Sequence, residues 1–197
     1  VSGSLGVRST GGSITLENAG NDVTGFAAAS TTGSISYLDS NALAVLGASG
    51  LGAFAPVNGV SVVNNTIFVG ANAGNLTINQ PIDAGATGTA RLRSGGTITQ
   101  TTPITAGSLG VRSTGSADLS LETNQIGLLA ANVGGITLAS GNSSGLTLGS
   151  VSGTSLFASA PDITSTGGGI LVSTGGRLCG SPPANPARRA RRPPGGL

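Results

Sequence analysis

The side chains that could do chemistry are few in this sequence and lie far apart. The 197 residues include no histidine, so neither a Ser-His-Asp nor a Cys-His arrangement can be built, and the most common zinc ligand is missing. The single cysteine, Cys179, lies near a Pro- and Arg-rich segment, where we interpret it as an incidental thiol. The acids are spread along the chain: Glu17, Asp22, Asp39, Asp83, Asp118, Glu122 and Asp162.

A pair of carboxylates is the catalytic arrangement most worth weighing, because glycosidases use two acids and several polysaccharide-degrading enzymes are β-helices. Glu17 aligns with Glu122 in an internal repeat described below, whereas Asp22 aligns with Gln125. An acid that recurs with a repeat is more often a solvated or turn residue than a catalyst. We therefore predict no catalytic residue and no enzyme activity.

Motifs for cofactors and metals are also missing. The GGGI sequence at 167–170 lacks the aspartate spacing of calcium-binding β-roll repeats, and no GK[ST] sequence follows it as in a nucleotide-binding loop. We predict no metal ligand, no cofactor-binding residue and no cofactor. Rows of Thr such as TITQTT (97–102) suit a flat ice-binding or glycan-binding face, but ordinary outward-facing strand residues explain them better.

The composition limits the kind of core that this chain can build. Only 8% of the residues are charged and 35 are glycine, while Ser, Thr and Asn fill the positions between aliphatic residues. Aromatic side chains make up only 3% of the sequence, so Val, Ile, Leu and Ala must fill a narrow core. No apolar run approaches the roughly 18 residues that span a bilayer, which predicts no transmembrane segment.

An internal duplication is the strongest signal in the sequence. The nonapeptide GSLGVRSTG occurs at 3–11 and again, unchanged, at 107–115. The similarity continues with small gaps, as NDVTGFAAAS (21–30) aligns with NQIGLLAANV (124–133) and ITLE (14–17) with LSLE (119–122). We infer two copies of a multi-strand unit, beginning near residues 3 and 107.

Alternating apolar residues predict short strands throughout both units. The alternating pairs are Ile14 and Leu16, Ile35 and Tyr37, Val60 and Val62, Ile67 and Val69, Leu76 and Ile78, Leu109 and Val111, Leu119 and Leu121, Ile136 and Leu138, and Leu146 and Leu148. The only helix candidates, FAAAS (26–30) and LLAAN (128–132), are too short to stand alone. Two or three such strands per coil favour an all-β parallel β-helix over the alternative, a β-sandwich.

Residues 74–115 carry a family resemblance. Their NLTI, LRSGG, ITQ and ITAGSL segments, with the ITL and GSIS strands, resemble the repeat region of filamentous haemagglutinin-like large exoproteins, adhesins of the two-partner secretion type. The resemblance covers residues 1 to about 175. It implies a right-handed parallel β-helix, recognition of the full-length parent by an outer-membrane transporter, display at the bacterial cell surface, and a host or neighbouring-cell receptor or glycan as partner.

The two ends of the chain depart from that family pattern. No signal peptide or secretion domain is visible after Val1, which suggests that upstream sequence is absent. We predict a β-solenoid over 1–175 and a disordered Pro/Arg/Gly-rich tail over 176–197, which holds five of the nine arginines. The tail could be a basic arm, but an out-of-frame reading after truncation explains it better. We therefore expect no nucleic-acid partner, and self-association through an uncapped coil.

These observations predict a structural and adhesive segment of a secreted bacterial surface exoprotein, acting in cell adhesion, aggregation or biofilm. Two alternatives stay open. One is a carbohydrate-active β-helix enzyme, for which a cleft with two acids would be evidence, and the other is a truncated fragment without function.

Overall fold

The computed structural model describes residues 3–121 and 123–180, and its regular secondary structure is entirely β. Within these two ranges there is no helix, and hence none that could cross a membrane. The main sheet has 19 strands, and every pairing within it is parallel. The all-β prediction is therefore confirmed, and both FAAAS and LLAAN lie in strands.

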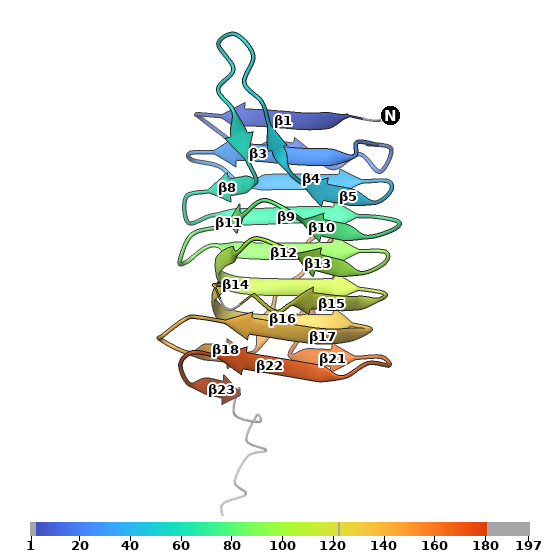
Figure 1. Cartoon of the computed structure of the whole chain (residues 1–197), viewed down its shortest axis with the longest axis vertical. Coiled ribbons are helices and arrows are strands. Elements are labelled where there is room, and N and C mark those ends of the chain that lie inside the picture. Colours follow the sequence, from blue (N-terminus) through green and yellow to red (C-terminus); the bar gives the residue numbers. More distant parts are fainter. Residues whose placement is uncertain (1–2, 122, 181–197) are drawn as a thin grey trace, which may run out of the picture.

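Two rows of strands run along the molecule, one coil above the next (Figure 1). Row A begins with β1 (Ser4–Ser9) and β3 (Gly25–Ser30) and then divides into two columns, because the first residues of β3 pair with β5 (Leu43–Val45) and its last residues with β8 (Val60–Val62). One column continues from β5 through β10 (Leu76–Ile78), β13 (Ile98–Gln100), β15 (Ser116–Leu119), β17 (Gly135–Ser140) and β22 (Ile170–Thr174), and the other continues from β8 to β11 (Ile82–Asp83). Row B contains β2 (Ile14–Leu16), β4 (Ile35–Asp39), β9 (Thr66–Ala71), β12 (Thr89–Ser94), β14 (Ile104–Ser113), β16 (Gln125–Val133), β18 (Leu146–Leu148), β21 (Ile163–Ser165) and β23 (Leu178–Gly180). The first residues of β14 also pair with β11, so this long strand joins the two rows.

The register of the strands places similar side chains above one another in successive coils. Ile35 pairs with Ile67, and Leu92 pairs with both Val69 and Val111, so each inward side chain lies on another aliphatic side chain in the next coil. These residues form one continuous core along the molecule. Burying aliphatic surface in this way contributes roughly 25 cal/mol per Å² of apolar area. The arrangement is compatible with a β-solenoid.

Buried polar side chains hold the turns between strands. Asn124 is fully buried, and its amide donates to the carbonyl oxygens of Leu119 and Ala139, each at 3.0 Å. In the first unit Asn21 donates in the same way to Leu16 and Leu38, at 3.0 and 3.1 Å. These bonds satisfy carbonyl groups that the strand ladders leave unpaired where the chain turns.

The duplication can be followed in three dimensions. Leu5 of β1 pairs with Phe26, and Leu109 of β14 pairs with Leu129, so Phe26 and Leu129 occupy corresponding places. One part of the sequence alignment is wrong, because Ile14 pairs with Ile35 whereas its counterpart beneath Ile136 is Ala117, not Leu119. The alignment of ITLE with LSLE is therefore shifted by two residues.

Each unit contains an antiparallel hairpin that interrupts a row. Hairpin 1 (residues 47–58) contains β6 (Gly47–Ala48) and β7 (Val57–Asn58), and hairpin 2 (residues 150–161) contains β19 (Ser150–Val151) and β20 (Ala160–Pro161). Phe26 pairs with Val45 and Ala28 with Val60, so residues 46–59 take the place of a single residue opposite Ala27. Hairpin 1 projects past β1 at the N-terminal end of the stack (Figure 1).

The structure also changes two predicted boundaries. Leu121 lies outside β15, which ends at Leu119, so the Leu119 and Leu121 alternation does not mark a strand. Sheet pairing continues to Gly180, because Leu178 of β23 pairs with Leu146, so residues 178–180 belong with the strands and not with the predicted tail. The remainder of that tail, 181–197, lies outside the described residues, as do residues 1–2 and Glu122.

Candidate functional site: an arginine-lined groove

Hairpin 2 folds back over the outward face of row B, where its side chains and backbone contact several strands. Phe157 is fully buried there, in a cluster that includes Phe68 on β9 and Leu38 on β4. A side chain at Gly110 would place its Cβ 2.9 Å from both Phe157 and Val151. The glycine in the middle of the repeated GSLGVRSTG therefore leaves room for the hairpin.

Arginine side chains on the strands beneath hairpin 2 bind its backbone. Arg112 Nη1 donates to the carbonyl oxygen of Ser159 at 3.2 Å, and Arg93 Nη1 donates to that of Leu156 at 3.3 Å. Arg91 Nε donates to the Ser152 carbonyl oxygen at 3.0 Å, and burial lowers the pKa of its guanidinium. All three acceptors are neutral, so these contacts place three positive charges on one face without neutralising them.

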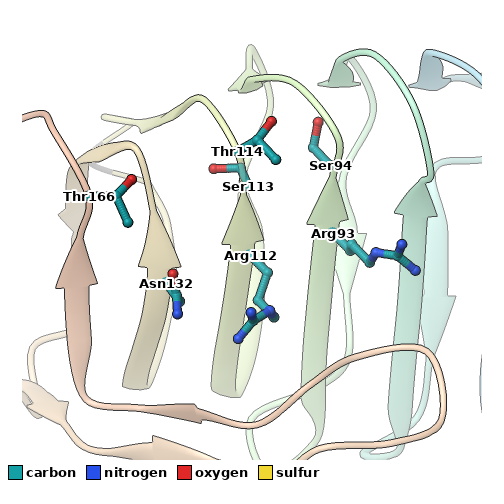
Figure 2. Close-up of a pocket in the computed structure, with 7 residues that line it drawn as sticks. All are labelled: Arg93, Ser94, Arg112, Ser113, Thr114, Asn132 and Thr166. Atoms are coloured by element: carbon teal, nitrogen blue, oxygen red, sulfur yellow. The ribbon is translucent and has the colours of Figure 1, made fainter.

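A groove of about 430 Å³ lies on this face, and two of the arginines that bind hairpin 2, Arg93 and Arg112, line it. It is lined by Arg93, Ser94, Arg112, Ser113, Thr114, Asn132 and Thr166. Figure 2 shows that these residues come from neighbouring parallel strands and their turns, with the two arginines and Asn132 below the hydroxyl side chains. None of the lining residues is an acid.

The chemistry of the groove suits an anionic, hydroxyl-rich ligand. A guanidinium presents five N–H donors in a planar fork that matches carboxylate or sulfate, and Arg112 uses only Nη1 in its bonds to hairpin 2. Ser, Thr and Asn side chains beside it can both donate to and accept from sugar hydroxyl groups. The groove also crosses several coils, as a linear polymer would.

The corresponding arginine of the first unit does not form such a groove. Arg8 Nη1 donates to the Pro56 carbonyl oxygen at 3.0 Å, which matches the Arg112 bond to hairpin 2. Arg112 has arginine neighbours because β12, which belongs to the end of the first unit, lies beside β14 and adds Arg91 and Arg93. Within the described residues, several guanidinium groups therefore gather beside hairpin 2 and not beside hairpin 1.

The acidic residues that were considered as catalytic candidates accept hydrogen bonds from neighbouring groups of the protein. Asn41 links two of them, since its amide donates to Asp22 at 3.2 Å and lowers the pKa of that carboxyl, and its backbone N–H donates to Asp39 at 2.9 Å. Asp39 is fully buried and also accepts from the Tyr37 hydroxyl at 2.8 Å and the Val23 N–H at 3.0 Å. Glu17 accepts from Ser36 at 2.6 Å.

In the second unit Ser140 replaces Asp39. Its hydroxyl oxygen accepts from the backbone N–H groups of Ile126 and Asn142, which correspond to Val23 and Asn41. A serine can fill the position, so we assign the Asp39 carboxylate to holding the turn.

Other potential ligands stay apart. Nowhere in residues 3–121 and 123–180 do three or more His, Cys, Asp or Glu side chains gather as a metal site would require. Cys179 is exposed on β23, next to the end of the described chain. It pairs with Thr147 in the strand ladder and contacts none of the groove residues named above.

The sequence did not predict the groove, because the arginines were considered only for their net charge and their side chains were not assigned to one face of a strand. The available signal was alternation: Arg91 and Arg93 take the outward positions of a strand whose inward positions are Ala90 and Leu92. Arg91 and Arg93 lie beside Arg112 because of the strand register, and all three arginines bind the backbone of hairpin 2. Alternation reveals neither the register nor the position of the hairpin.

In comparisons with known proteins, no family model, no curated protein and no solved structure matches this chain.

Proposed function

We propose that the chain is a structural and adhesive segment of a secreted bacterial surface exoprotein, folded as a right-handed parallel β-helix. The observation that carries this proposal is the parallel stacking of coils from β1 to β23 around one unchanging core. A protein of this kind grows longer by adding coils, and can display a surface far from its attachment. Right-handedness is supported by the rule that about 98% of parallel crossover connections have that hand.

The arginine-lined groove is the adhesive surface in this proposal, and acidic glycans are its ligands. Arg93 and Arg112 would pair with carboxylate or sulfate groups, while Asn132 and the hydroxyl side chains would bind the sugar hydroxyl groups. Cell adhesion, aggregation and biofilm formation follow from binding polymers on neighbouring cells.

A glycan array that contains neutral, uronic-acid and sulfated glycans tests this function. We expect the full chain to retain acidic glycans, and the variants Arg93→Gln and Arg112→Gln to lose at least about tenfold in affinity, since charge-assisted hydrogen bonds contribute roughly 1.5–3 kcal/mol. Arg8→Gln is the matched control, because Arg8 binds hairpin 1 as Arg112 binds hairpin 2 but lies outside the groove.

Two results would count against the adhesive proposal. One is a chain that retains no glycan at all, which would favour a fragment without function. The other is equal retention by the wild type, Arg93→Gln and Arg112→Gln, which would place any binding outside the groove. Far-UV circular dichroism of each variant checks that the β structure is kept.

The link between Asp22 and Asp39 through Asn41 is the one observation that favours a carbohydrate-active enzyme. Against it, Asp39 is fully buried and its oxygens accept three hydrogen bonds from the protein, so the two acids do not present a pair of carboxylates to a substrate. Release of reducing sugar from a polysaccharide, abolished by Asp22→Asn, would support this alternative over adhesion.

A further inference from the structure

A second, smaller pocket lies beside hairpin 2, away from both ends of the stack. Its volume is about 100 Å³, and it is lined by Thr89, Arg91, Ser108, Ser150, Val151 and Ser152. It shares no residue with the arginine-lined groove. The two lie toward opposite ends of β12, since Thr89 is the first residue of that strand and Ser94 of the groove is the last. The pocket is therefore a separate site.

The strand register brings the polar side chains of this pocket together. Thr89 and Arg91 lie on the outward face of β12, because the residues that alternate with them are fully buried. Thr89 pairs with Ser108 on β14, and neighbouring strands lie about 4.8 Å apart, so the two hydroxyl side chains are neighbours. Hairpin 2 adds Ser150 and Ser152 to this group.

Most of the hydrogen-bond donors in the pocket are unused by the protein. Arg91 Nε donates to the Ser152 carbonyl oxygen at 3.0 Å, but neither Nη atom of Arg91 has a partner in the part of the chain that the structure describes. In the same part, the hydroxyl groups of Thr89, Ser108 and Ser150 have no partner either. Two N–H groups and three hydroxyl groups are thus available to a ligand.

The guanidinium of Arg91 also lacks a counter-ion in the pocket. Burial lowers its pKa, because removal of water disfavours the charged form. Its bond to the Ser152 carbonyl oxygen is to a neutral group, and none of the residues that line the pocket is an acid. An anion in the pocket would offset this cost of desolvation.

We propose that this pocket binds a small tetrahedral oxyanion, sulfate or phosphate, between Arg91 and the hydroxyl groups of Ser108 and Ser150. The two Nη atoms of a guanidinium can donate parallel hydrogen bonds to two oxygens of such an ion, and the hydroxyl groups can donate to the others. A cavity needs only about 10–15 Å³ to hold a water molecule, so this one has room for an oxyanion.

The bound oxyanion joins hairpin 2 to the strands beneath it. Arg91 and Ser108 belong to β12 and β14, whereas Ser150 is the first residue of β19. A ligand held by both parts stabilises the seated hairpin, because it binds that conformation better than a detached one. The proposal goes beyond glycan binding and does not depend on it, since the groove has its own residues.

A nuclear magnetic resonance titration of the full, isotope-labelled chain with sodium sulfate tests the site, with chloride lowered to keep the ionic strength constant. We expect saturable shifts of the Arg91 side-chain signal and of the Ser108 and Ser150 amide signals. Arg91→Gln should weaken binding at least about tenfold, and Ser108→Ala, which keeps the Arg91 bond to hairpin 2, about threefold or more.

Arg8→Gln is the matched control for Arg91→Gln. Arg8 donates to a carbonyl oxygen of hairpin 1 at 3.0 Å, as Arg91 does to one of hairpin 2, but it lies outside the pocket. Its replacement should leave sulfate binding unchanged. Circular dichroism melts confirm that each variant is folded.

A sulfated monosaccharide, with its unsulfated parent beside it, distinguishes two sources of the oxyanion. Weaker binding of the sulfated sugar than of inorganic sulfate identifies the ligand as a free ion. Equal or tighter binding identifies it as the sulfate group of a glycan. Both results support an oxyanion site, provided that Arg91→Gln weakens the binding and the unsulfated sugar does not bind.

Proteolysis gives an independent measurement of the link to hairpin 2. Sulfate should slow cleavage within hairpin 2 of the wild type more than in Arg91→Gln, and this comparison removes the general stabilising effect of sulfate on folded proteins. Shifts that never saturate, or binding that is unchanged in both Arg91→Gln and Ser108→Ala, would overturn the proposal. Glycan retention that depends on Arg93 and Arg112 would still support the proposed function in that case.

Discussion

Gly59 and Asp162 take the same unusual backbone conformation at corresponding places, with φ angles of 73° and 58°. Each closes the neck of a hairpin: the Gly59 N–H donates to Leu46, and the Asp162 N–H donates to Gly149. Left-handed backbone costs about 1 kcal/mol for most residues, though Asp tolerates it better than most and Gly adopts it freely. The two sites differ in their neighbours, because a Cβ at Gly59 would collide with the Pro81 carbonyl oxygen.

We therefore expect the two single substitutions, Gly59→Asp and Asp162→Gly, to have unequal effects on stability. Gly59→Asp should destabilise the protein by more than about 2 kcal/mol, since it adds a backbone collision to the left-handed conformation. Asp162→Gly should leave the free energy of unfolding within about 1 kcal/mol of wild type. Urea denaturation followed by circular dichroism measures both, and a mild Gly59→Asp would show that the neck of hairpin 1 can shift.

Tyr37 makes stability depend on alkaline pH. Desolvation by burial, and then the hydrogen bond to Asp39, raise the pKa of this hydroxyl well above its usual range. The unfolded chain therefore loses the Tyr proton first, near pH 10, so the contribution is complete below that pH and is lost as the pH rises further. The sequence contains no other tyrosine and no histidine.

Melting temperatures between pH 8 and pH 11.5 should reveal this dependence. We expect the wild type to lose stability above about pH 10, and Tyr37→Phe to show a flatter profile from a somewhat lower starting value, because the hydrogen bond to Asp39 is lost. Parallel profiles for the two proteins would mean that another group causes the alkaline loss.

At the scale of elements, the sequence predicted the strands well and the hairpins not at all. Alternation located β2, β4, β8, β9 and β10 because every second side chain of each strand points into the core, and this period of two is visible without knowing the partner strand. The hairpins carry no alternation: ASGLGAFAP and VSGTSLFAS look like loops. Their place on the outer face depends on contacts with strands far away in the sequence, so the surface on which hairpin 2 meets Arg93 and Arg112 could not be predicted either.

Gly110 tests the seating of hairpin 2 as an element. Gly110→Ala puts a methyl group 2.9 Å from Phe157 and Val151, so we expect a loss of roughly 1–3 kcal/mol from overpacking and a hairpin that is cut faster by protease. Gly167→Ala is the control, because a Cβ there meets nothing within 4 Å. Equal protection of hairpin 2 in both variants would show that Phe157 can move aside.

At the scale of the whole molecule, the coil and the hairpin are separable parts. The core is continuous through both units. Each hairpin interrupts the strand ladder at a single register position, opposite Ala27 or Ala130. A hairpin can therefore be deleted without shifting the register of the strands on either side of it. The two removals uncover very different surfaces, because only hairpin 2 covers large side chains of several coils.

Matched deletions should separate these roles. Deleting 47–59 joins Leu46 to Val60 in the existing register, and we expect a folded protein that loses little stability. Deleting 150–162 joins Gly149 to Ile163 but exposes Phe68, Leu38 and Ala130, so we expect a loss of about 3 kcal/mol or more and binding of the dye ANS. Urea denaturation and ANS fluorescence compare the two. If deletion of 47–59 is as damaging as deletion of 150–162, hairpin 1 contributes to the stability of the core as hairpin 2 does.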